Sequence, residues 1–179
     1  MREIKKALRK ELIERRRTMD PEYKQAADLD IFEQIKPLAD KAGAVFTYAS
    51  TDIEVDTRRL IAYCLERGIP VALPRSGETE LSFYYISKSE DLTRGRFNID
   101  EPPTDKPASF DKNTLCVIPA LCADGEGCRL GYGRGYYDRF LGGFDGVGVI
   151  VCYSTFKQDV PTEPHDVKAN YTIFNRNPM

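Results

Sequence analysis

The sequence has one histidine, five cysteines and no long apolar run, and each scarcity excludes a class of protein. No stretch approaches the roughly 18 to 20 apolar residues of a bilayer-spanning helix, so we expect no membrane partner. The opening "MREIKKALRKELIERRR" lacks the apolar segment of a secretory signal. We therefore interpret the chain as a cytosolic, cytoplasmic protein.

The cysteines are odd in number and lie mostly in apolar stretches, so we expect no disulfide framework. Cys122 and Cys128 are candidate zinc ligands, but their spacing fits no C-x-x-C pair and a single histidine is present to complement them. Zinc ligation is thus the less favoured alternative to reduced, partly buried thiols. The five are Cys64, Cys116, Cys122, Cys128 and Cys152.

The net charge is small, at −2, but the charges are unevenly distributed along the chain. Residues 1–17 carry eight Lys or Arg and three Glu, a local charge of +5, which leaves −7 for the rest of the chain. Apolar residues from Ile4 to Ile13 recur at helical spacing, so this segment predicts a basic amphipathic helix. Such helices can bind nucleic acid, but the acidic remainder and the lack of a nucleic-acid motif argue against that partner.

Short apolar runs alternate with helical patterns along the rest of the chain. Asp20 followed by Pro21 predicts a helix start, and Gly68 predicts the end of a helix over 57–67. This alternation, without repeat or linker, predicts one α/β domain over 1–179, a three-layer domain with a mainly parallel sheet and helices on both faces. The expected strands are 44–50, 69–74, 81–87, 114–121, 146–153 and 171–174.

The run "RLGYGRGYYDRFL" (129–141) lies between a predicted buried strand and a predicted helix, where open α/β sheets bind ligands. Its glycines allow close backbone approach, and its arginines supply positive charge. The spacing G-x-G-x-G fits neither the dinucleotide fingerprint nor the Walker pattern. A phosphate-binding loop is favoured over a glycine-rich structural turn.

Six shorter segments of the chain, together with this loop, match the motifs of one known enzyme family in order and spacing. The chain resembles the 5-formyltetrahydrofolate cyclo-ligases, also called methenyltetrahydrofolate synthetases, over nearly its whole length. The glycine loop with its Tyr-Tyr-Asp is the specific part, and the other segments are weak alone. They are "KKALRKEL", "DIEVDT", "ALPR", "FNIDEP", "VIPAL" and "VPTEPHD".

The resemblance implies an enzyme that uses ATP and Mg²⁺ to convert 5-formyltetrahydrofolate to 5,10-methenyltetrahydrofolate, releasing ADP and phosphate. A formyl oxygen is a poor leaving group, so phosphorylation by ATP would activate it before the folate N10 closes the ring. Phosphoryl transfer depends on positioning and charge neutralisation, which suits arginines, a lysine, backbone N–H groups and magnesium.

Residue roles follow from the resemblance. For ATP and its phosphates it implies Lys5, Arg9, Arg129, Gly131, Gly133, Gly135 and Tyr137. For the folate it implies Glu54, Tyr132, Gly133, Arg134, Gly135 and Tyr136, with Arg134, Tyr132 and Tyr136 at the reacting atoms. For magnesium it implies Asp138 and Asp166.

Each role has an ordinary structural alternative. Asp138 could simply favour a helix dipole, Glu54 could cap the helix near Thr57, and one of the adjacent tyrosines could pack into the core. His165 is interpreted as a solvent-facing loop residue. Further basic residues of the first helix are interpreted as a solvated face; they are Lys6, Lys10, Arg15, Arg16 and Arg17.

Three positions depart from the family pattern. Ala123 stands where Phe is common, which would loosen an apolar wall near the folate, and Asn98 and Asn170 replace Gly and Asp. We interpret the chain as a monomeric salvage enzyme for 5-formyltetrahydrofolate. The alternatives are a non-catalytic folate or nucleotide-binding module and an ATP-dependent enzyme acting on another formyl or carboxyl compound.

Overall fold

A computed structural model describes residues 1–88, 93–94, 100–102 and 107–176. Its centre is a six-stranded sheet in which five neighbouring strands run parallel and only β2 and β3 pair antiparallel. The predicted α/β class is therefore confirmed. The strand order is β10 (Tyr171–Phe174), β9 (Val147–Cys152), β6 (Thr114–Pro119), β1 (Ala44–Phe46), β2 (Val71–Ser76) and β3 (Leu81–Ile86).

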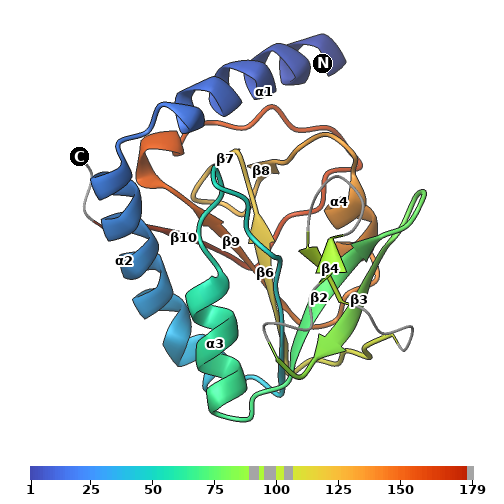
Figure 1. Ribbon diagram of the computed structural model, residues 1–179. Coiled ribbons are helices and arrows are strands. Elements are labelled where there is room, and N and C mark those ends of the chain that lie inside the picture. The colour runs from blue at the N-terminus through green and yellow to red at the C-terminus, as the bar shows by residue number, and fades with distance from the viewer. Residues whose placement is uncertain (89–92, 95–99, 103–106, 177–179) are drawn as a thin grey trace.

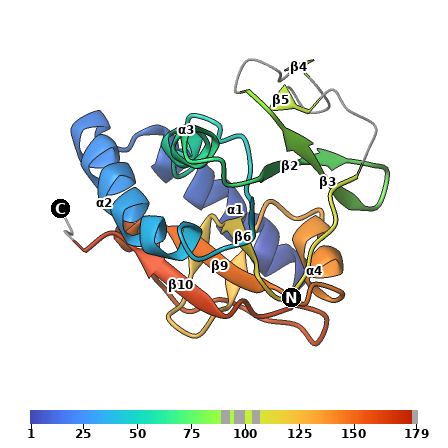
Figure 2. The same ribbon diagram turned by 90° about the horizontal axis from the view of Figure 1, so that it is seen from below.

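Helices cover both faces of the sheet, as predicted. The helices α2 (Pro21–Ala39) and α3 (Arg58–Glu66) lie on one face, and α4 (Tyr136–Leu141) lies on the other (Figures 1 and 2). The predicted cap is present, since the Asp20 carboxylate accepts from the Tyr23 amide at 3.2 Å. The central strands are buried throughout, because a parallel sheet covered on both faces has no solvent side.

The α4 face is packed with aromatic rings. Phe46 of β1 stacks on Phe83 of β3 at 4.7 Å, and Phe83 contacts Phe140 of α4 at 4.8 Å between ring centroids. Phe110 and Phe144 extend this cluster. Such rings each bury a large apolar area, so the cluster fixes α4 and the glycine loop before it against the sheet.

The first helix, α1 (Arg2–Arg17), lies on neither face but crosses the carboxyl edge of the parallel strands (Figure 1). Only part of its predicted apolar stripe is buried: Leu12 is fully buried, whereas Ile4 is 61% exposed. The side of α1 that carries Ile4 is therefore not packed closely against the loops that follow the strands.

Arg16 corrects the prediction of a solvated basic face. It is 3% exposed, and its guanidinium donates to the carbonyls of Ile53 at 2.8 Å, Ala120 at 2.6 Å and Leu121 at 3.0 Å. It also lies 4.7 Å from the ring centroid of Phe156. Arg16 therefore joins α1 to the loops after β1 and β6.

Some boundaries differ from the predictions. β1 ends at Phe46 rather than at residue 50, because the chain leaves the sheet to build the loop over 47–57. A small hairpin of β7 (Cys122–Ala123) and β8 (Arg129–Leu130) was not predicted. The other short elements are β4 (Thr93–Arg94), β5 (Asp100–Glu101) and the 3-10 helix η3 (Ser154–Phe156).

Three further findings concern the remaining sequence expectations. All five cysteines are free and buried, in agreement with the thiol interpretation. The departure at Asn98 lies outside the described residues. Within the described part of the chain, no helix is both long enough and apolar enough to cross a membrane.

Candidate functional site

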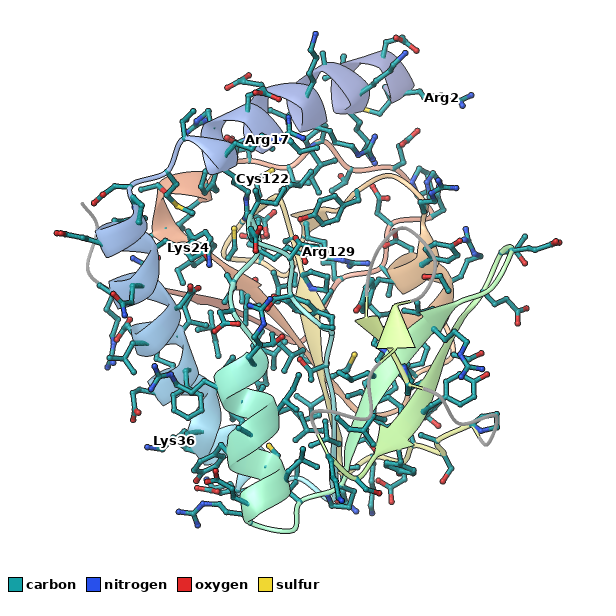
Figure 3. All side chains as sticks on the ribbon, viewed as in Figure 1. Arg2, Arg17, Lys24, Lys36, Cys122 and Arg129 are labelled. Atoms are coloured by element: carbon teal, nitrogen blue, oxygen red, sulfur yellow. The ribbon has the colours of Figure 1, made fainter. Side chains whose placement is uncertain are left out.

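A cavity of about 590 Å³ lies at the carboxyl edge of the sheet, under α1 and against the glycine loop. We call it the cleft. Figure 3 shows one of its residues, Arg129, below α1. The cleft is lined by every residue for which the sequence predicts a functional role. These residues are Lys5, Arg9, Glu54, Arg129, Gly131, Tyr132, Gly133, Arg134, Gly135, Tyr136, Tyr137, Asp138 and Asp166.

Lys5 closes one end of the cleft against the loop over 163–166. Its ammonium lies 2.6 Å from the carboxylate of Asp166 and 3.0 Å from that of Glu163, and the residue is 6% exposed. Burial alone would lower the pKa of Lys5, but the bonds to Asp166 and Glu163 outweigh it and raise that pKa. The pKa of Asp166 is lowered, because the same lysine and the Glu163 amide overcome its burial.

This pairing predicts a pH-dependent contribution to stability. Because the pKa of Asp166 is lowered in the folded state, its ionised carboxylate stabilises the fold at pH values above its ordinary pKa of 3.8. This stabilisation is lost as the pH falls through the lowered pKa. Because the pKa of Lys5 is raised, its ammonium stabilises the fold fully below pH 10.5. This stabilisation is lost as the pH rises through the raised pKa. Lys5→Met should therefore lower the free energy of unfolding by about 2 kcal/mol between roughly pH 4 and pH 10, and by less in stronger acid.

Urea unfolding at several pH values measures this difference. Lys41→Met is the matched control, because Lys41 is exposed and makes no ion pair among the described residues. A loss in Lys5→Met that stays constant into strong acid would contradict the ion-pair explanation.

The second cation of α1 that the sequence analysis assigned to ATP, Arg9, holds the glycine loop. Its Nε donates to the carbonyl of Gly131 at 2.8 Å. Gly133 has φ +96°, and a Cβ there would lie 3.0 Å from the Arg9 guanidinium carbon. Gly133 is thus required by backbone conformation and by the close approach of α1.

Glycine is present at positions 135 and 131 for different physical reasons. Gly135 has φ +67°, which favours glycine for conformational reasons. Gly131 has no positive φ, and a Cβ there would have no described atom within 4 Å. The structural-turn alternative therefore explains Gly133 and Gly135 but not Gly131, whose open side lets a ligand approach the backbone.

Arg129, at the start of the glycine loop, and Asp138 of α4 form a clamp that holds the two ends of this loop together. Arg129 donates to Asp138 Oδ1 at 2.8 Å and to the Val167 carbonyl at 2.7 Å. The Val167 amide also donates to Asp138 Oδ1 at 3.2 Å. The arginine side chain is 5% exposed, so this clamp fixes the start of α4 against the loop that carries Asp166.

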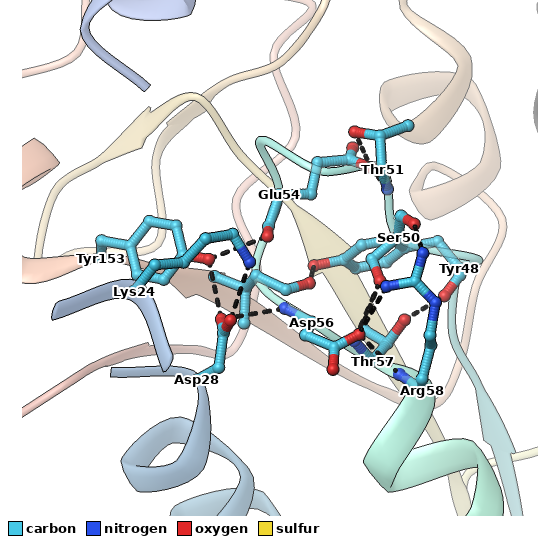
Figure 4. A network of polar contacts seen from close by, with 11 residues as sticks. Lys24, Asp28, Tyr48, Ser50, Thr51, Glu54, Asp56, Thr57, Arg58 and Tyr153 are labelled. Atoms are coloured by element: carbon cyan, nitrogen blue, oxygen red, sulfur yellow. Dashed lines mark hydrogen bonds and ion pairs between the residues drawn. The ribbon is translucent and has the colours of Figure 1, made fainter. Parts of the chain in front are cut away.

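Glu54 is held inside the loop after β1 (Figure 4). It is 8% exposed, and its Oε2 accepts from the Thr51 amide at 2.8 Å and the Thr51 hydroxyl at 2.9 Å. The Tyr48 hydroxyl donates to Val55, and the Tyr153 hydroxyl donates to the Glu54 carbonyl. This buried carboxylate is fixed before any ligand arrives.

The capping alternative for Glu54 is wrong. The Thr57 amide donates to the Ser50 hydroxyl at 3.2 Å, and the Arg58 amide donates to Asp56 at 3.1 Å. The start of α3 is thus satisfied by neighbours of Glu54, whose own side chain lines the cleft.

The three tyrosines of the loop have different surroundings. Tyr132 is 41% exposed, yet desolvation of its hydroxyl, the charge of Glu54 and a hydrogen bond to Glu54 raise its pKa. Tyr137 packs against the core, and its buried hydroxyl has no hydrogen-bond partner among the described residues. Tyr136 donates to the Gly77 carbonyl at 3.0 Å. The packing alternative thus applies to Tyr137, while Tyr132 remains a protonated donor in the cleft.

Several lining residues were missed by sequence reasoning. Glu163 lies three residues before Asp166 in "VPTEPHD", so proximity to the predicted metal ligand was the available signal. The β2–β3 hairpin contributes Pro74, Ser76 and Leu81 to the lining, which no sequence signal predicted. The fold holds this hairpin near α4, where Arg139 donates to the Thr79 carbonyl at 2.6 Å. His165 has a side chain that is 72% exposed, as predicted.

Two departures from the family pattern have a structural setting. Ala123 is fully buried in β7 and is not among the described residues that line the cleft, so its effect on an apolar wall near the folate stays a prediction. The Asn170 side chain accepts from the Gly148 amide at 2.7 Å, which supports the start of β10.

Comparisons with known proteins agree with this architecture. A model of the 5-formyltetrahydrofolate cyclo-ligase family matches residues 1–174. The Escherichia coli 5-formyltetrahydrofolate cyclo-ligase is 33% identical over 72% of this chain and 74% of its own. A probable 5-formyltetrahydrofolate cyclo-ligase of Schizosaccharomyces pombe is also 33% identical, but over 49% of this chain and 46% of its own. The solved 5,10-methenyltetrahydrofolate synthetase of Aquifex aeolicus is 28% identical, with a TM-score of 0.85 over 97% of this chain and 91% of that one.

Proposed function

This chain belongs to the 5-formyltetrahydrofolate cyclo-ligase family, and from that premise we propose that it uses ATP and magnesium to convert 5-formyltetrahydrofolate to 5,10-methenyltetrahydrofolate. One observation carries the proposal. A single cleft combines cations around an open glycine with a buried carboxylate that is fixed by its own loop. The first set suits phosphates, and the second suits the amino and ring N–H groups of a pterin.

The nucleotide is assigned to the wall formed by α1 and the glycine loop. Lys5, Arg9 and Arg129 bring positive charge to this wall, and the open side of Gly131 admits a phosphate close to the backbone. Each of these cations is already oriented by protein oxygens. Preorganised charge of this kind binds an anion with little loss of side-chain freedom.

The folate is assigned to the wall that carries Glu54. Its carboxylate accepts from the pterin, while the Tyr132 hydroxyl, which stays protonated at neutral pH, donates to Glu54 and helps to fix it. Tyr136, Gly133, Arg134 and Gly135 line the cleft between this wall and the nucleotide wall. The formyl oxygen and the terminal phosphate of ATP therefore meet beside Arg134.

The reaction proceeds in two steps. The formyl oxygen attacks the terminal phosphorus of ATP, the bond to ADP breaks, and the formyl group becomes an imidate-like phosphate. N10 then attacks the formyl carbon, loses its proton, and phosphate leaves with the former formyl oxygen. Arg134 stabilises the charge on the transferring phosphoryl group, which suits a planar, delocalised cation.

The residues of the cleft fit a magnesium ion held mainly by phosphate oxygens. Among the described residues there is no group of three or more His, Cys, Asp or Glu that could hold a metal by itself. Asp138 and Asp166 line the cleft, and magnesium commonly takes one or two carboxylates in addition to phosphate oxygens and waters. Bound there, the ion would neutralise phosphate charge.

The function is tested with purified protein, 5-formyltetrahydrofolate, ATP and magnesium. The methenyl product is expected to appear as near-ultraviolet absorbance, together with ADP. Ligand binding by calorimetry without product would instead indicate a folate or nucleotide-binding module. ATP hydrolysis stimulated only by another formyl or carboxyl compound would indicate a different substrate.

A further inference from the structure

A second cavity of about 460 Å³ adjoins the cleft between α1 and the glycine loop. It shares Arg2, Arg9, Tyr132 and Gly133 with the cleft, so the two spaces adjoin at these residues. Its α1 side is lined by Arg2, Lys6, Arg9 and Lys10, and we call it the basic groove. Positions 2, 6 and 10 are four residues apart and therefore lie along one stripe of the helix.

The other cations of α1 already have partners. Arg15 lies 3.5 Å from Glu11, Arg17 lies 2.6 Å from Glu14, and Lys5 is paired across the cleft. Arg16 donates to buried carbonyls. The remaining positive charges of this helix are the ones that line the groove.

Arg2, Lys6 and Lys10 are exposed and make no ion pair with any residue that the structure describes. Glu14 also lines the groove, but its carboxylate is engaged by Arg17. Three uncompensated cations beside a half-buried Arg9 make a surface that attracts a flexible polyanion or a pair of carboxylates.

Tyr132 connects this surface to the folate wall. Its hydroxyl bonds to Glu54, while the residue lines both the cleft and the basic groove. A folate is elongated: the pterin is followed by an aminobenzoyl group and then by a glutamate with two carboxylates. With the pterin at Glu54, the aminobenzoyl group crosses Tyr132 and the glutamate enters the groove.

We propose that the basic groove is the subsite for the glutamate carboxylates of the folate substrate, with Lys6 and Lys10 as specificity-determining residues. This inference rests on the proposed function, because it takes the pterin position from it. The lysines act on substrate preference and not on the reacting atoms, which lie at the other end of the folate.

The double variant Lys6→Gln/Lys10→Gln tests the subsite, with two substrates compared. One is 5-formyltetrahydrofolate, and the other is 5-formyltetrahydropteroate, which lacks the glutamate. The ratio of kcat/KM for the first to that for the second should fall about fivefold in the variant, as expected for the loss of two exposed ion pairs. KM for ATP should stay unchanged. Lys41→Gln/Lys112→Gln removes the same charge from exposed positions outside both cavities and should leave the ratio intact.

An unchanged ratio would overturn the subsite, and a rise in KM for ATP in its place would assign the groove to the nucleotide. These results are distinct from failure of the proposed function. In that case the unaltered protein makes no methenyl product from either substrate, and the glutamate subsite is rejected together with the proposed function. Raising the salt concentration should lower the preference of the unaltered protein toward that of the variant, because exposed charges are screened.

Discussion

Replacing Arg134 with alanine is expected to lower kcat about 100- to 1000-fold while changing KM for ATP much less. Arg134 lines the cleft between Gly133 and Gly135, and its carbonyl accepts from the Arg139 guanidinium at 2.9 Å. The backbone at Arg134 is thus held in place where the residue lines the cleft. A charge that matters most in the transition state affects turnover more than binding.

Steady-state kinetics of methenyl formation measures this effect. Arg67→Ala is a suitable control, since Arg67 is an exposed arginine beyond the end of α3 and does not line the cleft. Arg134→Lys should recover only part of the loss, because an ammonium lacks the planar fork of a guanidinium. A turnover number unchanged in Arg134→Ala would remove Arg134 from the reacting centre.

Arg16→Met is expected to lower the free energy of unfolding by about 3 kcal/mol or more. The substitution leaves the carbonyls of Ile53, Ala120 and Leu121 without their donor. Methionine keeps an apolar chain of similar length but also removes the guanidinium that lies 4.7 Å from the Phe156 ring centroid, so the loss reports on the hydrogen bonds together with this cation–π contact. Buried acceptors that lose a charged donor keep the full cost of their desolvation.

The comparison variant is Arg17→Met, one residue further along the same helix. The Arg17 side chain is 61% exposed and pairs only with Glu14 among the described residues, so about 0.5 kcal/mol or less is expected. Chemical unfolding of both variants gives the difference. Equal losses in the two would show that the contacts of Arg16 with the loops contribute little to stability.

The sheet could be predicted because its strands are dense in apolar residues. The segments over 114–119 and 147–152 are almost wholly buried, so they carry no competing polar pattern. β1 was predicted too long, since Tyr48 is as apolar as a strand residue but packs inside the loop that holds Glu54. Local composition cannot distinguish a residue that is buried in a strand from one that is buried inside a loop.

The grouping of the candidate site residues around one cleft was predictable from the sequence, whereas their contacts with one another were not. The resemblance placed Lys5, Asp138 and Asp166 in one site, and the structure brings them to one cleft. The partners of these residues depend on contacts between distant segments, such as Lys5 with Asp166 and Arg129 with Asp138. Arg16 shows the same limit: its basic neighbours suggested solvent, whereas the carbonyls that bury it come from residues 53, 120 and 121.

The contact between Lys5 and Asp166 joins positions 161 residues apart, and this separation sets an order of events during synthesis. During synthesis α1 leaves the ribosome before the loop that carries Asp166 and must wait for it. Until that loop emerges, α1 carries its positive charge without the carboxylates that fix it. Under the proposed function, the nucleotide wall therefore forms only after residue 166 has emerged, and nucleotide binding by a nascent chain would report that step.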